Sequence, residues 1–173
     1  GNADEYRAFL QTIREEIERL NAIIKDFLAL ARGGQLNKVL VELKGYFNEI
    51  VSLARLETEK RGVAIKVDIE SGLAAEIDKN EMKKVFVNLI QNALQAISDD
   101  GDISITAHKV PSGHVQIDIQ NSGAPIPLED RNRIFQPYFT TRPDGTGLGL
   151  AICRRIIADH GGTMELLEGE PTT

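Results

Sequence analysis

The sequence predicts an α+β fold: a two-layer sandwich with helices on one face of a sheet, preceded by one long helix of coiled-coil type. Three observations predict it. Residues 5–31 repeat apolar side chains at spacings of three and four, residues 63–69 alternate strictly between apolar and polar, and residues 103–108 and 115–120 are placed to pair as a hairpin. With 173 residues, 42% of them apolar, the chain can bury a core without disulfide bonds.

The N-terminal segment, residues 5–31, is predicted to form a single helix. Its apolar residues form a heptad seam: Leu10, Ile13, Ile17, Leu20, Ile24, Phe27 and Ala31. At about 1.5 Å per residue this helix is about 40 Å long and cannot bury its own stripe, so we expect partner helices from another chain or another segment. Gly33 and Gly34 are expected to end it, which divides the chain into a helical segment, 1–33, and an α+β domain, 34–173.

The domain is expected to alternate helices and strands. In order, we predict a helix over 36–61, a strand over 63–69, a helix over 79–98, strands over 103–108 and 115–120, a segment rich in glycine and proline over 121–147, a helix over 148–160 and a strand over 163–167. Because two of the strands form a hairpin, a mixed sheet covered by helices is favoured over a doubly wound parallel sheet.

Composition excludes several classes of protein. The chain has 26 acidic and 20 basic residues, a formal net charge of −6, which argues against nucleic acid as a partner. The single cysteine, Cys153, lies in an apolar run and is expected to be buried, and one cysteine excludes a disulfide framework. Since no apolar stretch reaches the roughly 18 residues of a membrane span, we expect a cytoplasmic fragment without membrane contact, whether or not the parent protein is membrane-anchored.

The helix over 79–98 carries two asparagines one turn apart, Asn88 and Asn92, with Gln95 on the same face. Asparagine is unfavourable inside helices because its amide competes for backbone hydrogen bonds. A solvated polar stripe and a binding site both explain the pattern. Amide oxygens suit Mg²⁺, which takes its remaining ligands from water and nucleotide phosphates.

Two glycine-containing segments offer backbone groups to a ligand. Residues 145–150, Gly-Thr-Gly-Leu-Gly-Leu, run into a helix whose N-terminus favours phosphate, although a hinge would also explain the glycines. This spacing is neither a P-loop nor a dinucleotide fingerprint. Residues 121–127 follow a strand, and Asn121 places an amide there, although an ordinary turn would also use asparagine.

Between these two segments, residues 133–142 belong to a loop long enough to indicate a functional lid. Phe135 and Phe139 are expected to anchor it. Arg142 is expected either to contact a phosphate or to be simply solvated.

Taken in order, the segments resemble the ATP-binding catalytic domain of sensor histidine kinases in the GHKL superfamily. Residues 88–93 are similar to its asparagine motif, 121–127 to its first glycine motif, 133–142 to its phenylalanine motif and 145–150 to its second glycine motif, and the turn at 160–162 also fits. The resemblance covers about residues 36–170. The helix over 5–31 resembles the second helix of the family's dimerisation and phosphoacceptor hairpin, which implies a homodimer through a helical bundle in the parent protein.

The resemblance implies ATP and Mg²⁺ as cofactors. Asn92 would coordinate Mg²⁺ with support from Asn88, the two acting as catalytic residues, and Asn121 would face the adenine amine. The residues implied to contact ATP are Asn88, Asn92, Gln95, Asn121, Gly123, Ile126, Phe135, Tyr138, Thr140, Thr141, Arg142, Gly145, Thr146, Gly147, Leu148, Gly149 and Leu150. The γ-phosphoryl group would pass to a histidine and then to an aspartate of a response-regulator receiver domain.

The chain departs from the family pattern in three ways. Asn121 stands where the family usually has aspartate and Pro125 where it has glycine, so binding of adenine is expected to be weaker. No histidine lies on the heptad helix, so the chain alone is expected to bind ATP without autophosphorylation. His108, His114 and His160 are expected to be structural. The family also has one further strand beyond the last residues of this chain.

Three other functions are compatible with parts of the sequence. The superfamily's ATP-hydrolysing members carry glutamate where Asn88 stands, and an amide cannot take a proton from water, which disfavours an ATPase. A non-catalytic nucleotide-sensing or dimerising scaffold would explain Asn121 as decay of the site, but the intact asparagine and glycine motifs disfavour it. A protein serine kinase is disfavoured by the heptad helix.

Overall fold

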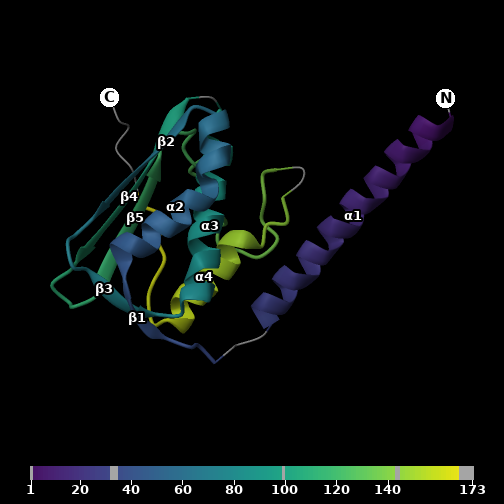
Figure 1. Cartoon of the computed structure of the whole chain (residues 1–173). Helices are drawn as coiled ribbons and strands as arrows, with labels where there is room; N and C mark the ends of the chain where they lie inside the picture. The colour runs from purple at the N-terminus through teal and green to yellow at the C-terminus, as the bar shows by residue number, and fades with distance from the viewer. Residues whose placement is uncertain (1, 32–34, 99, 143–144, 168–173) are drawn as a thin grey trace.

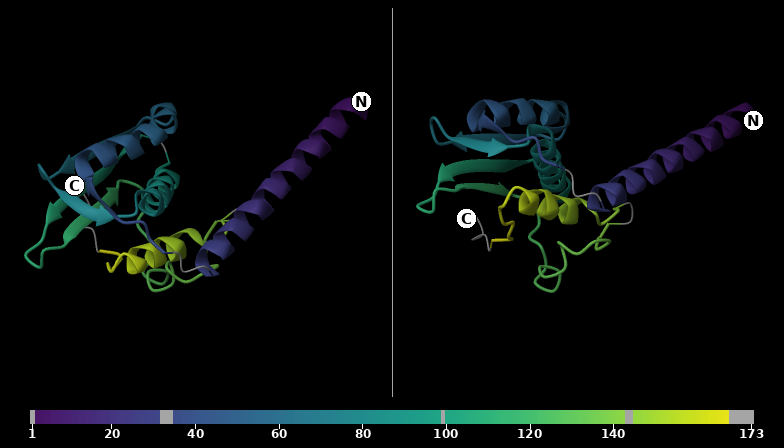
Figure 2. Two further views of the ribbon diagram at one scale, coloured as in Figure 1. Left: turned by 60° about the horizontal axis from the view of Figure 1, so that its bottom comes forward. Right: turned by 90° about the horizontal axis from the view of Figure 1, so that it is seen from below.

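The computed structural model describes residues 2–31, 35–98, 100–142 and 145–167. Its elements, in order, are α1 (Asn2–Ala31), β1 (Val39–Glu42), α2 (Leu43–Lys60), β2 (Val63–Ile69), β3 (Ala74–Ile77), α3 (Lys79–Ala96), β4 (Gly101–Lys109), β5 (Val115–Asn121) and α4 (Gly149–Asp159). Helices α2, α3 and α4 lie on one face of the strands, while α1 extends away from them (Figure 1, Figure 2). The predicted two-layer α+β class is confirmed.

The main sheet has the strand order β2-β4-β5. β2 runs parallel to β4, with Ile65 opposite Ile103, and β4 runs antiparallel to β5, with Ile105 opposite Ile119. The predicted hairpin is therefore confirmed, as is the alternating strand over 63–69. A parallel pair needs a long crossover connection, and here α3 lies within it.

Apolar side chains from the helices and the sheet meet in one core. Phe47 of α2 and Phe86 of α3 pack edge to face, with their ring centroids 4.6 Å apart, against the fully buried Ile103 and Ile105 of β4. Cys153 of α4 is buried among them, as predicted, and this burial raises the pKa of its thiol to about 12. The buried face of α3, the helix that carries Asn88 and Asn92, is thus packed against this core.

The predicted helix over 36–61 was wrong at its start, because residues 36–38 form no regular element and Val39–Glu42 form strand β1. This strand pairs antiparallel with β3, a strand that the sequence analysis did not predict. Glu42 then caps α2, its carboxylate accepting the N–H groups of Lys44 at 3.0 Å and Gly45 at 2.7 Å. β1 and β3 are four residues each, too short for a recognisable pattern, and each depends on the other for its hydrogen bonds.

The predicted strand over 163–167 was also wrong: these residues form no regular element. Met164 packs against the core, while Leu166 and Leu167 are exposed. Alternating side chains are insufficient for a strand, which also needs a neighbour for its backbone groups, and within the described residues this segment has none. The family's further strand lies outside the described residues.

α1 covers the predicted helix over 5–31, and its predicted end at Gly33 and Gly34 lies outside the described residues. The described members of its apolar stripe, such as Leu10, Ile17 and Ile24, are about half exposed. No helix in the described part of the chain is both long enough and apolar enough to cross a membrane.

Candidate functional site

The candidate site begins with the outward face of α3. The opposite face of this helix is buried through Met82, Val85, Phe86 and Ile90, so Asn88 and Asn92 are left half-buried at the surface of the domain. The Nδ2 of Asn92 donates to the Oδ1 of Asn88 at 2.9 Å. This bond orients both amides and leaves the Oδ1 of Asn92 directed away from its neighbour.

That oxygen faces the loop that the sequence predicts to be a lid. The Nη1 of Arg142 donates to the Oδ1 of Asn92 at 3.5 Å, a long hydrogen bond across 50 residues of sequence. A cationic group therefore already lies beside this amide oxygen. The same oxygen is a suitable ligand for a hard cation, whereas the oxygen of Asn88 is occupied by Asn92. No cluster of three or more histidine, cysteine, aspartate or glutamate side chains able to hold a metal ion occurs among the described residues.

The N-terminus of α4 lies directly against Asn88. A Cβ atom added at Gly149 would collide with the Asn88 amide, approaching within 2.9 Å of its Oδ1 and 3.0 Å of its Cγ. The N-cap residue of this helix is the fully buried Leu148, whose side chain makes no capping hydrogen bond. Within the described part of the chain, the first N–H groups of α4 thus have no side-chain partner, which is the arrangement that binds phosphate at helix N-termini.

The glycine-rich segment before α4 packs closely on the lid. Gly147 has a φ of +66°, and a Cβ there would lie 2.5 Å from the carbonyl carbon of Tyr138. Gly145 leaves no room for a Cβ beside the side chain of Thr140, whose Oγ1 accepts the N–H of Arg142 at 3.1 Å. The backbone of one segment therefore sets the position of the other.

The lid is a succession of turns with two aromatic anchors. The guanidinium of Arg133 lies over the ring of Phe139 at 4.3 Å, and that of Arg154, on α4, lies 5.6 Å from the centre of the Phe135 ring. Both phenylalanines are half-buried, in agreement with the predicted anchoring role. Tyr138 is exposed and has a φ of +67°, an unusual conformation for a bulky residue.

The first glycine segment meets the opposite end of α3. Asn121 ends β5 opposite Ile103, and a Cβ on Gly123 would lie 2.8 Å from the backbone nitrogen of Ile97, just past α3. The N–H of Ala124 donates to the carbonyl of Ala96 at 3.2 Å. This segment therefore packs against the C-terminal end of α3, about one helical turn beyond Asn92.

The structure thus brings the predicted residues together in two groups. Asn88, Asn92, Tyr138, Thr140, Arg142, Gly145, Gly147 and Gly149 are linked by the contacts above, and Thr146 joins them because its Oγ1 accepts the Leu148 N–H at 3.4 Å. Asn121 and Gly123 gather at the C-terminal end of α3. Gln95, Thr141, Ile126 and Leu150 belong to the same segments, Gln95 and Thr141 exposed and Ile126 and Leu150 half-buried.

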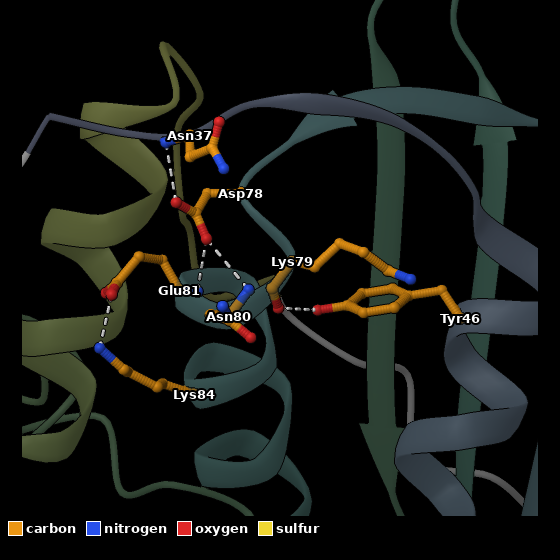
Figure 3. A network of polar contacts seen from close by, with 7 residues as sticks. All are labelled: Asn37, Tyr46, Asp78, Lys79, Asn80, Glu81 and Lys84. Carbon is orange, nitrogen blue, oxygen red and sulfur yellow. Dashed lines mark hydrogen bonds and ion pairs between the residues drawn. The ribbon is translucent and has the colours of Figure 1, made fainter.

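One cluster near the site was not predicted. Asp78 caps α3, its Oδ1 accepting the N–H groups of Asn80 at 3.0 Å and Glu81 at 3.1 Å, while its Oδ2 accepts the N–H of Asn37 at 2.9 Å (Figure 3). The Asn37 bond first, then the bond from Glu81, holds the pKa of Asp78 below its ordinary value. The Asp-x-x-Glu pattern before an apolar run was a usable signal for the cap, but not for the contact with Asn37.

One groove lies away from Asn88 and Asn92. It holds about 390 Å³ beside β1 and α2 and is lined by Val39, Leu40, Glu42, Tyr46, Glu49 and Lys79, among others. The Tyr46 hydroxyl there already donates to the carbonyl of Lys79 at 2.7 Å (Figure 3). With no glycine-rich segment or uncapped helix N-terminus at this groove, the asparagine face of α3 remains the better candidate.

Residues 77–173, more than half of the chain, match the family model described as histidine kinase-, DNA gyrase B-, and HSP90-like ATPase. The chain belongs to this family. Within it, the chain is 33% identical over 167 residues to the sensor histidine kinase ZraS of Escherichia coli, covering 96% of this chain and 36% of that protein. It is 33% identical over 167 residues to the C4-dicarboxylate transport sensor protein DctB of Rhizobium meliloti, covering 95% and 27%.

Solved structures agree with this assignment. The histidine kinase ThkA, crystallised in complex with the response regulator protein TrrA, superposes with a TM-score of 0.76 at 31% identity, covering 94% of this chain and 47% of that one. Full-length ShkA in complex with AMPPNP superposes with a TM-score of 0.79 at 26% identity, covering 91% and 34%. The chain therefore contains the ATP-binding domain of a GHKL histidine kinase, and it spans about a third of the length of the curated relatives it matches.

Proposed function

We propose that this chain is the catalytic part of a sensor histidine kinase, which binds ATP with Mg²⁺ and presents the γ-phosphoryl group to a histidine outside this chain. The phosphoryl group would then pass to an aspartate of a response-regulator receiver domain. One observation carries the proposal: the N-terminus of α4, uncapped among the described residues, lies against Asn88, while the Oδ1 of Asn92 faces Arg142. An amide oxygen that suits a hard cation, helix amides that suit phosphate and a positive charge thus lie side by side.

Each residue has a role that follows from its chemistry. Asn92 is the proposed Mg²⁺ ligand, and Asn88 orients it through their 2.9 Å bond. The amides of residues 145–150 and the start of α4 would hold phosphate oxygens, and Arg142 would exchange Asn92 for a phosphate. When bound, Mg²⁺ neutralises phosphate charge, so the residues of this chain contribute mainly positioning.

The remaining predicted contacts belong to the proposal as well. Asn121 and Gly123, at the end of α3, would hold the adenine, with Gln95 and Ile126 beside them. Phe135 and Tyr138 would shape the lid, and Thr140, Thr141 and Thr146 would offer hydroxyl groups to the phosphates.

Asn88 also separates the proposed kinase from an ATPase of the same family. An amide cannot accept a proton from an attacking water, so the site has no general base at this position. We therefore expect slow hydrolysis in this chain, with the phosphoryl group kept for a histidine acceptor.

The assembly is proposed on the same grounds. The exposed apolar stripe of α1 supports packing into a helical bundle of two copies in the parent protein, with residues 1–33 as one helix of its hairpin and residues 34–173 as the catalytic domain. A cytoplasmic location and a receiver-domain partner follow from the proposed relay.

The test is calorimetric titration with AMPPNP, with and without Mg²⁺. Asn92→Ala is expected to weaken Mg²⁺-dependent binding at least about tenfold, or about 1.4 kcal/mol. Asn48→Ala is the matched control, because Asn48 is an exposed asparagine on α2, away from the site. Equal AMPPNP affinity of wild type and Asn92→Ala, or a wild-type affinity that is the same with and without Mg²⁺, would contradict the proposed role of Asn92.

A further inference from the structure

The last residue of the α4 region, His160, joins the two helices that build the site. Its Nε2 lies 3.0 Å from the backbone nitrogen of Asp78, and its Nδ1 lies 2.7 Å from the carbonyl oxygen of Ile156. An N–H can only donate and a carbonyl can only accept, so Nε2 must carry a lone pair and Nδ1 the proton. The geometry therefore selects the neutral imidazole with its proton on Nδ1.

The same point also receives the segment that follows α1. The Nζ of Lys38 donates to the carbonyl of His160 at 3.3 Å, and the N–H of Asn37 donates to the carboxylate of Asp78 at 2.9 Å. The end of α4, the start of α3 and residues 37–38 thus form one connected set of hydrogen bonds, which we call the clasp. His160 is the member that links the two helices directly.

The clasp and the asparagine face hold α3 and α4 at two separate points. At one point Asp78 meets His160; at the other, Asn88 meets Gly149 with no space for a methyl group. At about 1.5 Å per residue these points lie about 15 Å apart along α3. Between them, buried Cys153 of α4 lies against α3, its Sγ 3.8 Å from the carbonyl of Val85. A helix fixed at both ends cannot slide or rotate without releasing one of the two contacts.

We propose that His160 is a positioning residue for the nucleotide site: by accepting the Asp78 N–H, it keeps the N-terminus of α4 against Asn88. This rests on the proposed function, since it assigns the α4 N-terminus to phosphate. His160 lies at the opposite end of α4 from the proposed phosphate site, so it acts by fixing the position of this helix. Without the bond to Asp78, the uncapped N–H groups of α4 lose their fixed position relative to Asn88 and Asn92.

The test separates the link between helices from the local bond within α4. Gln places an acceptor oxygen the same number of bonds from Cα as Nε2, so His160→Gln keeps the bond to Asp78. Asn places its amide at the distance of Nδ1, so His160→Asn keeps the bond to Ile156 but cannot reach Asp78. AMPPNP affinity with Mg²⁺ is measured for both variants well below their unfolding temperatures, and the Gly149 amide signal is followed by NMR without nucleotide.

His160→Asn is expected to bind AMPPNP about fivefold more weakly, the factor for one net hydrogen bond, and to shift the Gly149 signal. His160→Gln is expected to restore both to the wild-type values. Equal losses in the two variants, or none in either, would overturn the proposal. So would a wild-type ¹⁵N spectrum with the His160 proton on Nε2, which needs no variant. If wild type binds no nucleotide the proposed function fails, yet the Gly149 signal still decides whether His160 positions α4.

Discussion

The N-termini of α3 and α4 make an instructive pair. α3 begins at Asp78, whose carboxylate accepts two N–H groups of the first turn and a third from Asn37. α4 begins at Gly149 after the buried Leu148, and no side chain among the described residues caps it. A helix whose first turn is satisfied by its own chain has a structural start. A helix whose first turn is left open beside two oriented amides has a start suited to an outside ligand.

The hydrogen bonds around Asp78 and around Asn92 show the same contrast between groups paired within the chain and groups left open to a ligand. Around Asp78 and His160, the hydrogen-bonding groups are paired with one another, and their bonds connect the end of α4, the start of α3 and residues 37–38. Around Asn92, one amide hydrogen is donated to Asn88, and the one partner of the amide oxygen among the described residues is Arg142, at 3.5 Å. The first region is expected to govern stability and the second to govern ligand affinity, and substitutions can separate these effects.

The largest effect is expected from Gly149→Ala. The added methyl group would enter the space of the Asn88 amide and separate α4 from α3, so AMPPNP affinity should fall by at least about tenfold, or about 1.4 kcal/mol. Alanine also favours helix over glycine by about 1 kcal/mol, which offsets part of the lost packing. The free energy of unfolding should therefore fall by less than the free energy of AMPPNP binding. Calorimetry and thermal unfolding measure the two quantities.

Gly162→Ala is the matched control for that change. A Cβ there would lie 3.1 Å from the Cγ2 methyl of Ile157, at the far end of α4 from the site. Unchanged nucleotide binding in Gly149→Ala would mean that the close contact with Asn88 is not needed.

A smaller effect, on stability, is expected from Asp78→Ala. Loss of a helix cap costs about 0.5–2 kcal/mol, and Asp78→Asn, which also caps well, should cost less. Urea unfolding measures both. Equal stability of wild type and Asp78→Ala would show that the bonds accepted by the Asp78 carboxylate do not stabilise the domain.

The same carboxylate predicts the sign of a pH effect. Because the bond from Asn37 first, and then the others, lowers the pKa of Asp78, its contribution to stability is present above the ordinary aspartate pKa. That contribution is lost as the pH falls through the lower folded-state value. The stability difference between wild type and Asp78→Asn should therefore shrink in acid.

The smallest effect concerns Cys153, which lies between the two regions. Burial raises the pKa of this thiol to about 12, so almost no thiolate exists at pH 8 and a thiol reagent should react only when α4 leaves α3. The labelling rate at pH 8 should be higher in Gly149→Ala than in wild type. In denaturant, both proteins should be labelled rapidly. Rapid labelling of native wild type would contradict the tight packing of these helices.

Much of the fold could be predicted because its elements carry their own patterns. Strict alternation over residues 63–69 identified β2, and the spacing of apolar residues identified α3 and the face on which Asn88 and Asn92 lie. The two glycine-containing segments were found because their residues suit close backbone approach, and Gly147 and Gly149 do lie where a Cβ would collide.

The errors share one physical cause. β1 and β3 are too short to show a period, and they form because they pair with each other across more than 30 residues. Residues 163–167 show a suitable pattern but find no neighbour among the described residues. In each case the deciding contact is between segments distant in sequence, and side-chain pattern carries no information about it.

The sequence by itself determined which residues of the helices face the core, where α3 and α4 lie along the chain, and which polar side chains stand out from an apolar helix. Only the tertiary structure decided that Asn92 turns its oxygen toward Arg142, that α4 starts without a cap against Asn88, and that His160 accepts the Asp78 N–H. The first set depends on local backbone geometry and burial, which repeat along the chain. The second depends on how two helices are placed relative to each other, and that placement exists only once the core is packed.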